Sequence, residues 1–150
     1  MQENLTIVHV DCGKTWGGGQ AQVFMLLEGL RKIGHRNILV CREDCPLAKR
    51  ASEAGVASVA KARFGTLTMP RVVRILDKVT RDEGAHVLHL HDSRAHSIGA
   101  LFAAQTPERP PIVVSRRVAF DGRPTILSKW KYRHGADHYI AISNASARTV

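Results

Sequence analysis

The sequence has little of what marks a secreted or membrane-spanning protein. Its three cysteines, Cys12, Cys41 and Cys45, are an odd number without a paired framework, which favours a reducing compartment over a disulfide scaffold. No apolar run approaches the roughly 20 residues that a membrane-spanning helix needs. The first residues also lack the basic start of a secretory signal. We therefore expect a cytoplasmic protein.

Positive charge, by contrast, is in excess. The 150 residues include 22 Lys and Arg against 13 Asp and Glu, which gives a formal net charge of +9 at pH 7. The apolar share of 44% and the charged share of 23% are ordinary for a globular domain, which excludes a disordered chain. The basic balance favours an anionic partner, which is nucleic acid, a phosphorylated small molecule or an acidic membrane surface.

Short apolar runs alternate with amphipathic segments along the chain. We predict strands at 5–10, 36–41, 56–59, 86–91, 111–115 and 139–142, and helices at 20–33, 46–54, 70–83, 93–105 and 124–134, with one more after Ser143. In the helix at 124–134 we expect Ile126, Leu127 and Trp130 to face inward. The alternation predicts an α/β fold, a Rossmann-like doubly wound parallel sheet with helices on both faces, formed by one domain over residues 1–150.

Ligands of open parallel sheets bind beyond the carboxyl ends of the strands, so the residues that follow each strand are candidates for a site. The first group is a glycine loop, in which Gly17, Gly18 and Gly19 precede Gln20 at the start of a helix. Free N–H groups and the positive end of the helix dipole suit a phosphate there. A turn that only lets strand and helix pack is the alternative, and the loop matches neither the Walker A pattern nor the dinucleotide fingerprint.

The second group is histidine-rich. His89, His91 and Asp92 lie at the end of the fourth predicted strand, with His96 close behind. Alternation along a strand puts His89 and His91 on one face. One interpretation is a metal-dependent hydrolase that uses His89, His91 and His96, although Ser93 stands where the known ligand spacing needs an aspartate. The other is that His89 is a core residue, while His91 and Asp92 lie where the strand meets a site.

Cationic residues form the remaining groups. Arg116 and Arg117 end the fifth predicted strand, where two guanidinium groups suit a phosphate or carboxylate, unless they are a solvated pair. Lys131 lies in a helix that interleaves basic residues with Trp130 and Tyr132. Such a helix suits nucleic acid or an anionic membrane surface, and the nucleic-acid interpretation requires both aromatic rings to be exposed.

Taken in order, these motifs resemble the N-terminal half of a GT-B retaining glycosyltransferase of family 4. The segments that carry the resemblance are Trp16-Gly-Gly-Gly-Gln20, Gly34-His35, Val87-Leu-His-Leu-His-Asp92, Ile112-Val-Val-Ser-Arg-Arg117 and Ala136-Asp-His-Tyr-Ile-Ala-Ile-Ser143. The resemblance spans nearly the whole chain.

The resemblance implies a two-domain enzyme that moves a sugar from a nucleotide-sugar to an acceptor, in a cleft between two Rossmann-like halves. It implies neither a bound metal nor a cofactor beyond the nucleotide-sugar substrate. This half would hold an anionic, lipid or saccharide acceptor of the cell envelope. We expect the sequence to be truncated before a C-terminal domain that binds the nucleotide-sugar, so the 150 residues alone should be inactive.

The resemblance also assigns roles to residues. The glycine loop would lie beside the donor diphosphate and the acceptor. Arg117 stands where related enzymes carry a histidine that contacts the transferred sugar, which indicates a phosphate-bearing acceptor or a rearranged site. His91 and Asp92 become the candidates for contacts to the sugar or the attacking hydroxyl, with Asp92 as a general base.

An anion or acceptor site is expected to include Arg116, Arg117, Lys131 and Ser143. A peripheral position on the inner face of an anionic membrane fits the basic surface, and no nucleic-acid partner is expected. The alternatives are a stand-alone basic binding module for nucleic acid or an anionic ligand, and the metal-dependent hydrolase.

Overall fold

The computed structural model describes residues 3–116 and 125–141. Within these ranges, strands and helices alternate as predicted. The elements are β1 (Thr6–Val10), α1 (Gly18–Lys32), β2 (Arg36–Arg42), α2 (Pro46–Glu53), β3 (Ser58–Ala62), α3 (Met69–Asp82), β4 (Val87–Leu90), α4 (Ser93–Gln105), β5 (Ile112–Arg116), α5 (Ile126–His134) and β6 (His138–Ala141). The helix predicted after Ser143 lies outside the described residues.

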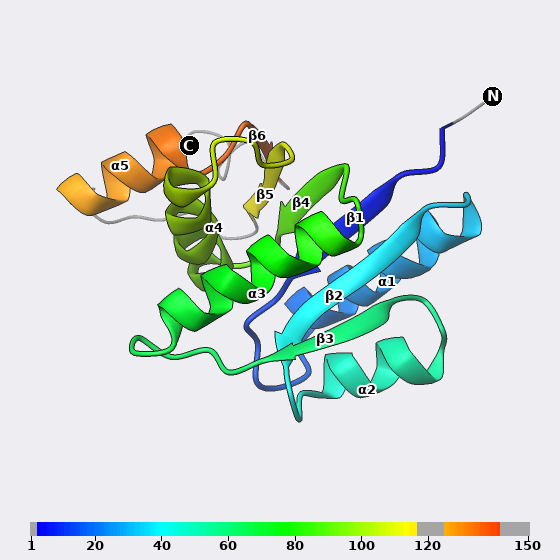
Figure 1. Ribbon diagram of the computed structural model, residues 1–150. Coiled ribbons are helices and arrows are strands. Elements are labelled where there is room, and N and C mark those ends of the chain that lie inside the picture. Colours follow the sequence, from blue (N-terminus) through cyan, green and yellow to red (C-terminus); the bar gives the residue numbers. More distant parts are fainter. Residues whose placement is uncertain (1–2, 117–124, 142–150) are drawn as a thin grey trace.

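The six strands form one parallel sheet in the order β3-β2-β1-β4-β5-β6 (Figure 1). The register sets Val8 of β1 opposite Ile38 of β2 and Leu88 of β4. Strands β2 and β3 are added on one side of β1, and β4, β5 and β6 are added on its other side, so the strand order reverses between β1 and β4. This arrangement confirms the doubly wound sheet, and a reversal of this kind is where open α/β sheets bind ligands.

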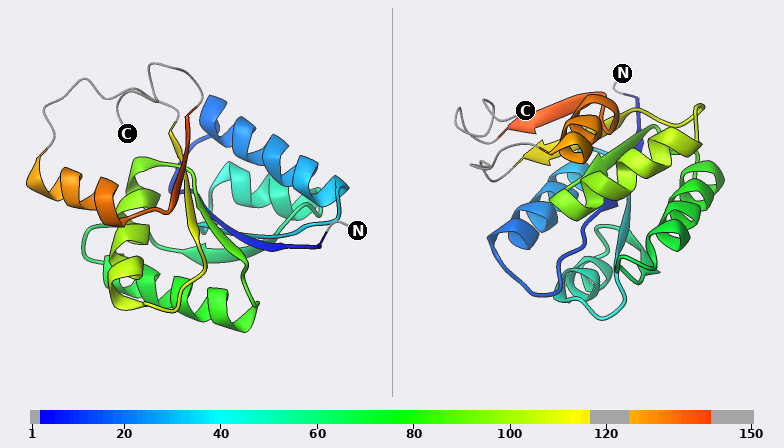
Figure 2. Two further views of the ribbon diagram at one scale, coloured as in Figure 1. Left: turned by 90° about the horizontal axis from the view of Figure 1, so that it is seen from above. Right: turned by 90° about the vertical axis from the view of Figure 1, so that its left-hand side faces the viewer.

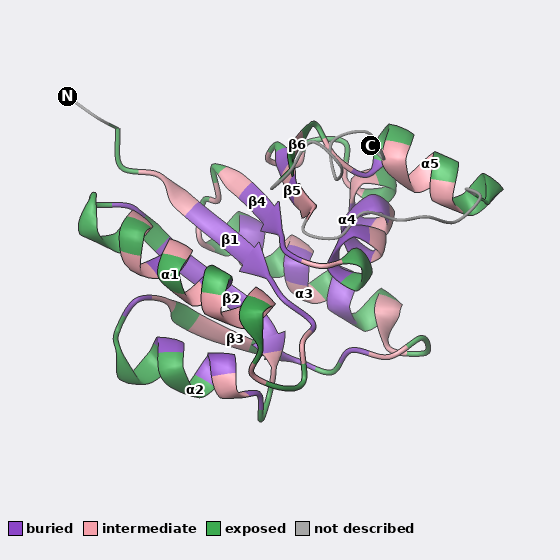
Figure 3. Cartoon of the chain, turned by 180° about the vertical axis from the view of Figure 1, so that it is seen from behind, coloured by how far each residue is buried: buried purple, intermediate pink, exposed green. Residues whose placement is uncertain are grey.

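Helices cover both faces of the sheet, as the sequence predicts. Helices α1 and α2 lie on one face, α3 and α4 lie on the other, and α5 packs beside α4 (Figure 2). Strand alternation directs Val8 and Val10 into the core under α3 and α4, whereas Leu39 and Cys41 join Leu27 under α1 and α2. Buried residues therefore follow the central strands and the inner stripes of the helices (Figure 3).

Glycines end three of the helices. Gly34, Gly55 and Gly84 have φ of 93°, 63° and 59°, a left-handed conformation that a side chain disfavours. The predicted left-handed cap at Gly34 is confirmed, and so is the predicted position of Pro46 in the first turn of α2. These turns return the chain to the next strand, and they keep all the carboxyl ends of the strands at one edge of the sheet.

Helix α5 corrects one expectation. Ile126 and Leu127 were expected to face inward, but they are 89% and 75% exposed, and Trp130 is half-buried. Among the described helices, α5 packs chiefly against α4, and this contact leaves Ile126 and Leu127 at the start of α5 exposed. No described helix is long and apolar enough to cross a membrane.

Candidate functional site

A cavity of about 440 Å³ opens at the carboxyl ends of β1, β4 and β5, where the strand order reverses. Its described lining is Asp11, Gly19, Gln20, Gln22, His91, Asp92, Ser93, His96, Val114, Ser115 and Arg116. Five residues predicted for the site therefore share one cavity, namely Gly19, Gln20, His91, Asp92 and Arg116. Gly17 and Gly18 lie in the adjoining loop, Lys131 lies on α5, and Arg117 and Ser143 are outside the described residues.

Asp11 is a residue of this cavity that the sequence analysis did not single out. It follows β1 and is 1% exposed. Its Oδ1 accepts hydrogen bonds from the N–H of Gly13 at 2.9 Å and from Gln20 Nε2 at 3.3 Å. A Cβ on Gly13 would lie closer than 3.0 Å to both side chains, so a larger residue there would force Asp11 and Gln20 to shift. A polar residue directly after a central strand was the signal that could have found Asp11.

The glycine loop leaves the start of α1 open. Gly17 is the N-cap of the helix, no side chain caps it, and the first turn holds no acidic residue. Gly18 has no atom within 4 Å of the place where its Cβ would be. A helix start of this kind, without a side-chain cap or a nearby acidic residue, suits an anion because the helix dipole favours negative charge there.

Asp92 is held by three backbone donors. Its Oδ1 accepts from the N–H groups of Arg94 and Ala95, both at 2.9 Å, which makes it the N-cap of α4. Its Oδ2 accepts from the N–H of Cys12 at 2.6 Å. The carboxylate therefore fixes the start of α4 and ties the loop after β4 to the loop after β1.

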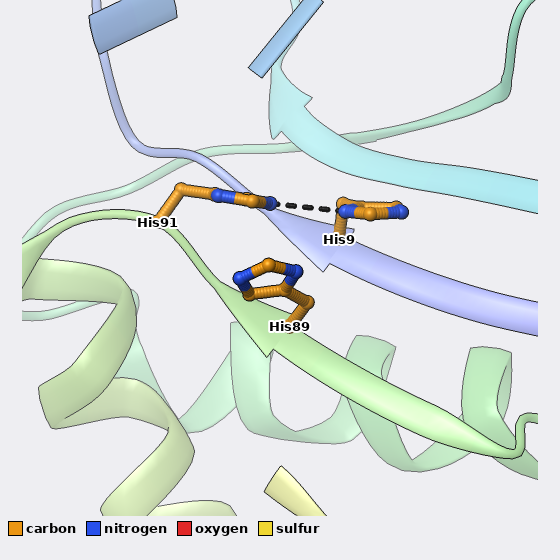
Figure 4. Close-up of side chains that lie close together, drawn as sticks. All are labelled: His9, His89 and His91. Carbon is orange, nitrogen blue, oxygen red and sulfur yellow. Dashed lines mark hydrogen bonds between the residues drawn. The ribbon is translucent and has the colours of Figure 1, made fainter. Parts of the chain in front are cut away.

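Three buried histidines, His9, His89 and His91, pack against one another at the base of the cavity (Figure 4). The ring centroids of His89 and His91 are 4.1 Å apart, and those of His9 and His91 are 5.2 Å apart. His9 Nδ1 and His91 Nε2 are joined by a hydrogen bond of 2.9 Å. His89 Nε2 lies 2.8 Å from Ser115 Oγ.

An asparagine side chain determines how the protons are distributed. Asn37 Nδ2 donates to the carbonyls of Leu27 and Val56, at 2.9 and 3.0 Å, so Asn37 Oδ1 faces His9 as an acceptor. His9 Nε2, at 3.3 Å from that oxygen, must then carry its proton. It follows that His9 Nδ1 accepts and that His91 Nε2 donates. Burial, with the nearby His89 adding to it, lowers the pKa of His9 to about 3 and keeps the ring neutral.

The histidines come together differently from the set proposed for a hydrolase. His96 lies on α4 and does not join the described cluster, and His9 takes its place. His96 Nε2 is instead 3.3 Å from the hydroxyl of Tyr139, and its ring meets the edge of Tyr132. The sequence grouping of His89, His91 and His96 as one set of metal ligands is therefore wrong, because the His96 ring packs against Tyr132 and Tyr139 and not against the other histidines.

Two cations lie near the other end of the cavity. The Arg116 guanidinium stacks on the ring of Tyr132, 4.9 Å from its centroid, and Lys131 Nζ lies 3.3 Å from Ser93 Oγ. Burial lowers the pKa of Lys131, and the charge of Arg116 lowers it further. Burial, then Lys131 and Arg116, also lower the pKa of His96 to about 4. Arg116 therefore lines this end of the cavity beside a neutral imidazole, and Lys131 lies next to it at Ser93.

The aromatic residues of α5 do not form an open platform for bases. Tyr132 is half-buried between Arg116 and Tyr139, and Trp130 lines a separate cavity of about 330 Å³. Nucleic-acid binding by stacking needs exposed rings. The arrangement of α5 therefore does not meet the requirement set for a nucleic-acid module.

Several solved glycosyltransferases share this architecture. HepE of Anabaena, in complex with UDP and glucose, superposes with a TM-score of 0.73 at 17% identity, over 97% of this chain and 40% of that one. MurG of Acinetobacter baumannii superposes with a TM-score of 0.69 at 9% identity, over 95% of this chain and 42% of that one. A glycosyltransferase of Rickettsia africae superposes with a TM-score of 0.66 at 12% identity, over 95% of this chain and 38% of that one. The chain thus spans about 40% of the length of these neighbours.

Sequence comparison gives the family. No curated protein sequence matches the chain. The family model described as Glycosyltransferase Family 4, however, matches residues 16–150, which include the glycine loop, every described cavity residue except Asp11, and both cationic groups. The resemblance carried by the sequence motifs is thereby confirmed, and this chain belongs to glycosyltransferase family 4.

Proposed function

We propose that this chain is the acceptor-binding half of a retaining glycosyltransferase, which moves a sugar from a nucleotide-sugar to an anionic, lipid or saccharide acceptor of the cell envelope. Family membership supports the reaction class. The observation that carries the assignment of this half is the cavity at the strand reversal, which has the start of α1 on one side and Arg116 on the other, with Lys131 beside Ser93 at its margin. The neighbouring HepE structures contain UDP, UDP-glucose or UDP with glucose.

The proposal divides the work between two halves. Because the chain spans about 40% of its structural neighbours, a second Rossmann-like half would supply most contacts to the donor. Transfer would need no cofactor beyond that donor, and the 150 residues alone would be inactive. The glycine loop would lie against the donor diphosphate at the junction of the two halves, since phosphates favour the start of a helix.

Each residue of the cavity takes a role in this proposal. His91 lines the cavity and is the candidate for contact with a sugar or acceptor hydroxyl. The three backbone donors on Asp92 favour a positioning role for it over the general-base role expected from the sequence. Arg116 and Lys131 bind the anionic group, together with Arg117 and Ser143.

Anion binding by this chain can be tested directly. We expect pyrophosphate to shift the backbone amide signals of Gly18, Gly19 and Ser93 in NMR spectra. Arg116→Gln should weaken this binding at least about tenfold, because one charge-assisted hydrogen bond is removed. Arg74→Gln, on the exposed side of α3, is the matched control. Equal affinity in the Arg116 variant and the control would refute the anion site.

Catalysis is tested with the protein encoded by the complete gene. Sugar transfer from a panel of nucleotide-sugars to envelope lipid and saccharide acceptors is compared between that protein and the 150-residue chain. We expect transfer only from the longer protein. Transfer by the chain alone would contradict the division into two halves. Failure of both proteins with every donor, in the presence of pyrophosphate binding, would contradict the reaction class.

A specific surface supports a peripheral position on the inner face of the membrane. Leu67, Ile126 and Leu127 are 97%, 89% and 75% exposed, and the start of α3 lies beside α5 in the cavity that Met69 and Leu127 share. Exposed basic residues lie within four positions of these apolar side chains in the sequence, namely Arg63, Arg71 and Lys129. We propose that this face docks on anionic lipid from the cytoplasmic side, with apolar insertion added to charge attraction.

The docking surface is tested by sedimentation with vesicles. Binding should require phosphatidylglycerol and should fall as salt is raised. Leu127→Ser should reduce it, whereas Met25→Ser, at a 60% exposed position of α1, should not. Equal binding to neutral and anionic vesicles would remove the proposal.

A further inference from the structure

We infer that His9, His89 and His91 form a binding site for one divalent transition-metal ion of borderline softness, for which Zn²⁺ and Co²⁺ are the natural candidates. The inference does not depend on the proposed transfer reaction, and it departs from the expectation of no metal that came from the sequence. The set is also different from the one considered for a hydrolase, because His9 replaces His96.

The register of the sheet creates the convergence. His9 of β1 and His89 of β4 are direct partners in the parallel ladder, and His91 lies two residues further along on the same face. One nitrogen from each ring lies within 4.8 Å of the other two. Nitrogens bound to one tetrahedral zinc at about 2.0–2.1 Å are about 3.3 Å apart. The rings must therefore rotate so that the three nitrogens converge on one ion.

The outer ring nitrogens of His9 and His89 face oxygen partners, as the outer nitrogens of metal-bound histidines usually do. His9 Nε2 donates to Asn37 Oδ1, and the Asn37 amide is itself anchored to two backbone carbonyls. His89 Nε2 lies 2.8 Å from Ser115 Oγ. Oxygen partners of this kind fix the tautomer of a ligating imidazole and orient its other nitrogen toward the metal. His9 would thus bind through Nδ1, and His89 would also offer Nδ1.

Access and the remaining coordination position come from the cavity. His9 and His89 are buried, but His91 also lines the 440 Å³ cavity, through which an ion and a water molecule reach the cluster. Three imidazoles and one water complete a tetrahedron. Asp11 follows His9 by two residues and adds a buried carboxylate to the same cavity, which favours a cation there.

Binding requires one proton to move. In the metal-free molecule, His91 Nε2 carries the proton that it donates to His9 Nδ1. Both nitrogens must offer lone pairs to the ion, so His91 transfers its proton from Nε2 to Nδ1, on the side of the ring away from His9. All three imidazoles stay neutral, and no net proton is released.

The test uses the untagged chain, treated with a chelator and then dialysed. Titration with Co²⁺ should give one equivalent of bound ion with the visible absorption of tetrahedral cobalt, and Zn²⁺ should displace it. His89→Gln should abolish the site. Ser115→Ala should weaken it by about 10–100-fold, because only the outer partner is lost. His134→Gln, at an exposed position on α5, is the matched control and should bind as the unmodified chain does.

NMR of the imidazole nitrogens keeps the inference falsifiable if a variant misfolds. In the unmodified chain, Zn²⁺ should switch the proton of His91 from Nε2 to Nδ1. Absence of saturable binding, or of the tautomer switch, would show that the three rings are only a hydrogen-bonded part of the core. Equal binding by folded His89→Gln and His134→Gln would overturn the inference as well. None of these measurements involves sugar transfer, so this inference and the proposed function succeed or fail separately.

Discussion

Acid should destabilise this chain well before its carboxylates titrate, because two buried histidines resist protonation. The pKa of His9 is lowered to about 3 and that of His96 to about 4, in both cases chiefly by burial, from an ordinary value of 6.5. Between pH 6.5 and pH 4, these two histidines are therefore protonated in the unfolded chain but remain neutral in the folded chain. Stability is complete above pH 6.5 and decreases as the pH falls through this window.

The size of the effect follows from linkage. Each unit between the pH and the unfolded pKa is worth about 1.4 kcal/mol per group. At pH 5, 1.5 units below the ordinary value, each of the two histidines reduces the free energy of unfolding by about 2 kcal/mol relative to pH 7.5. Together they remove about 4 kcal/mol, which is a large part of the 5–15 kcal/mol typical of a domain.

Urea unfolding followed by the fluorescence of the two tryptophans measures this directly. A chelator is kept in the buffer so that no metal contributes. His9→Gln should be less stable than the unmodified chain at pH 7.5, and the gap should narrow by about 2 kcal/mol at pH 5 because one refused proton is gone. His134→Gln should run parallel to the unmodified chain. An unfolding free energy that does not change between pH 7.5 and pH 5 would refute the reasoning.

Three substitutions test the packing around the cavity by the same assay. Gly99→Ala should destabilise by about 1–3 kcal/mol, because its Cβ would lie closer than 3.0 Å to Leu90 Cδ1. Gly29→Ala, which meets no atom within 4 Å, should instead stabilise by about 0.5–1 kcal/mol, and equal effects would contradict this view of the α4–β4 contact. Asp92→Ala should lower the free energy of unfolding by about 1–2 kcal/mol, because the N-cap of α4 is lost. Asp44→Ala, at an exposed position, is the control. Equal stability of the two variants would show that the cap does not stabilise the fold.

The order of the elements could be predicted because each depends on a local pattern, but one boundary shows the limit. Residues 56–59 were predicted as a strand, whereas β3 is Ser58–Ala62. Val56 is buried and donates its N–H to the carbonyl of Ala51, so its apolar side chain completes the end of α2. Apolar character alone does not distinguish a helix end from a strand start.

The site divides along a similar line. Residues that directly follow a central strand, such as His91 and Arg116, could be predicted because the rule for parallel sheets names their location. His9 could not be predicted as a site residue, because it lies inside an apolar strand and the residue it pairs with in the sheet, His89, is 80 residues away in the sequence. The exposure of Leu127 was equally hidden, because it depends on where α5 packs and not on the pattern within α5.

The peptide groups on both sides of Cys12 are pinned. Asp92 accepts the N–H of Cys12 at 2.6 Å, and Arg42 Nε donates to the Cys12 carbonyl at 2.9 Å. The base of the glycine loop is thus held by Asp92, which follows β4, on one side and by Arg42 of β2 on the other. A ligand at this edge of the sheet would therefore meet a backbone that is already fixed at Cys12, so the ordering cost of binding would be small at this residue.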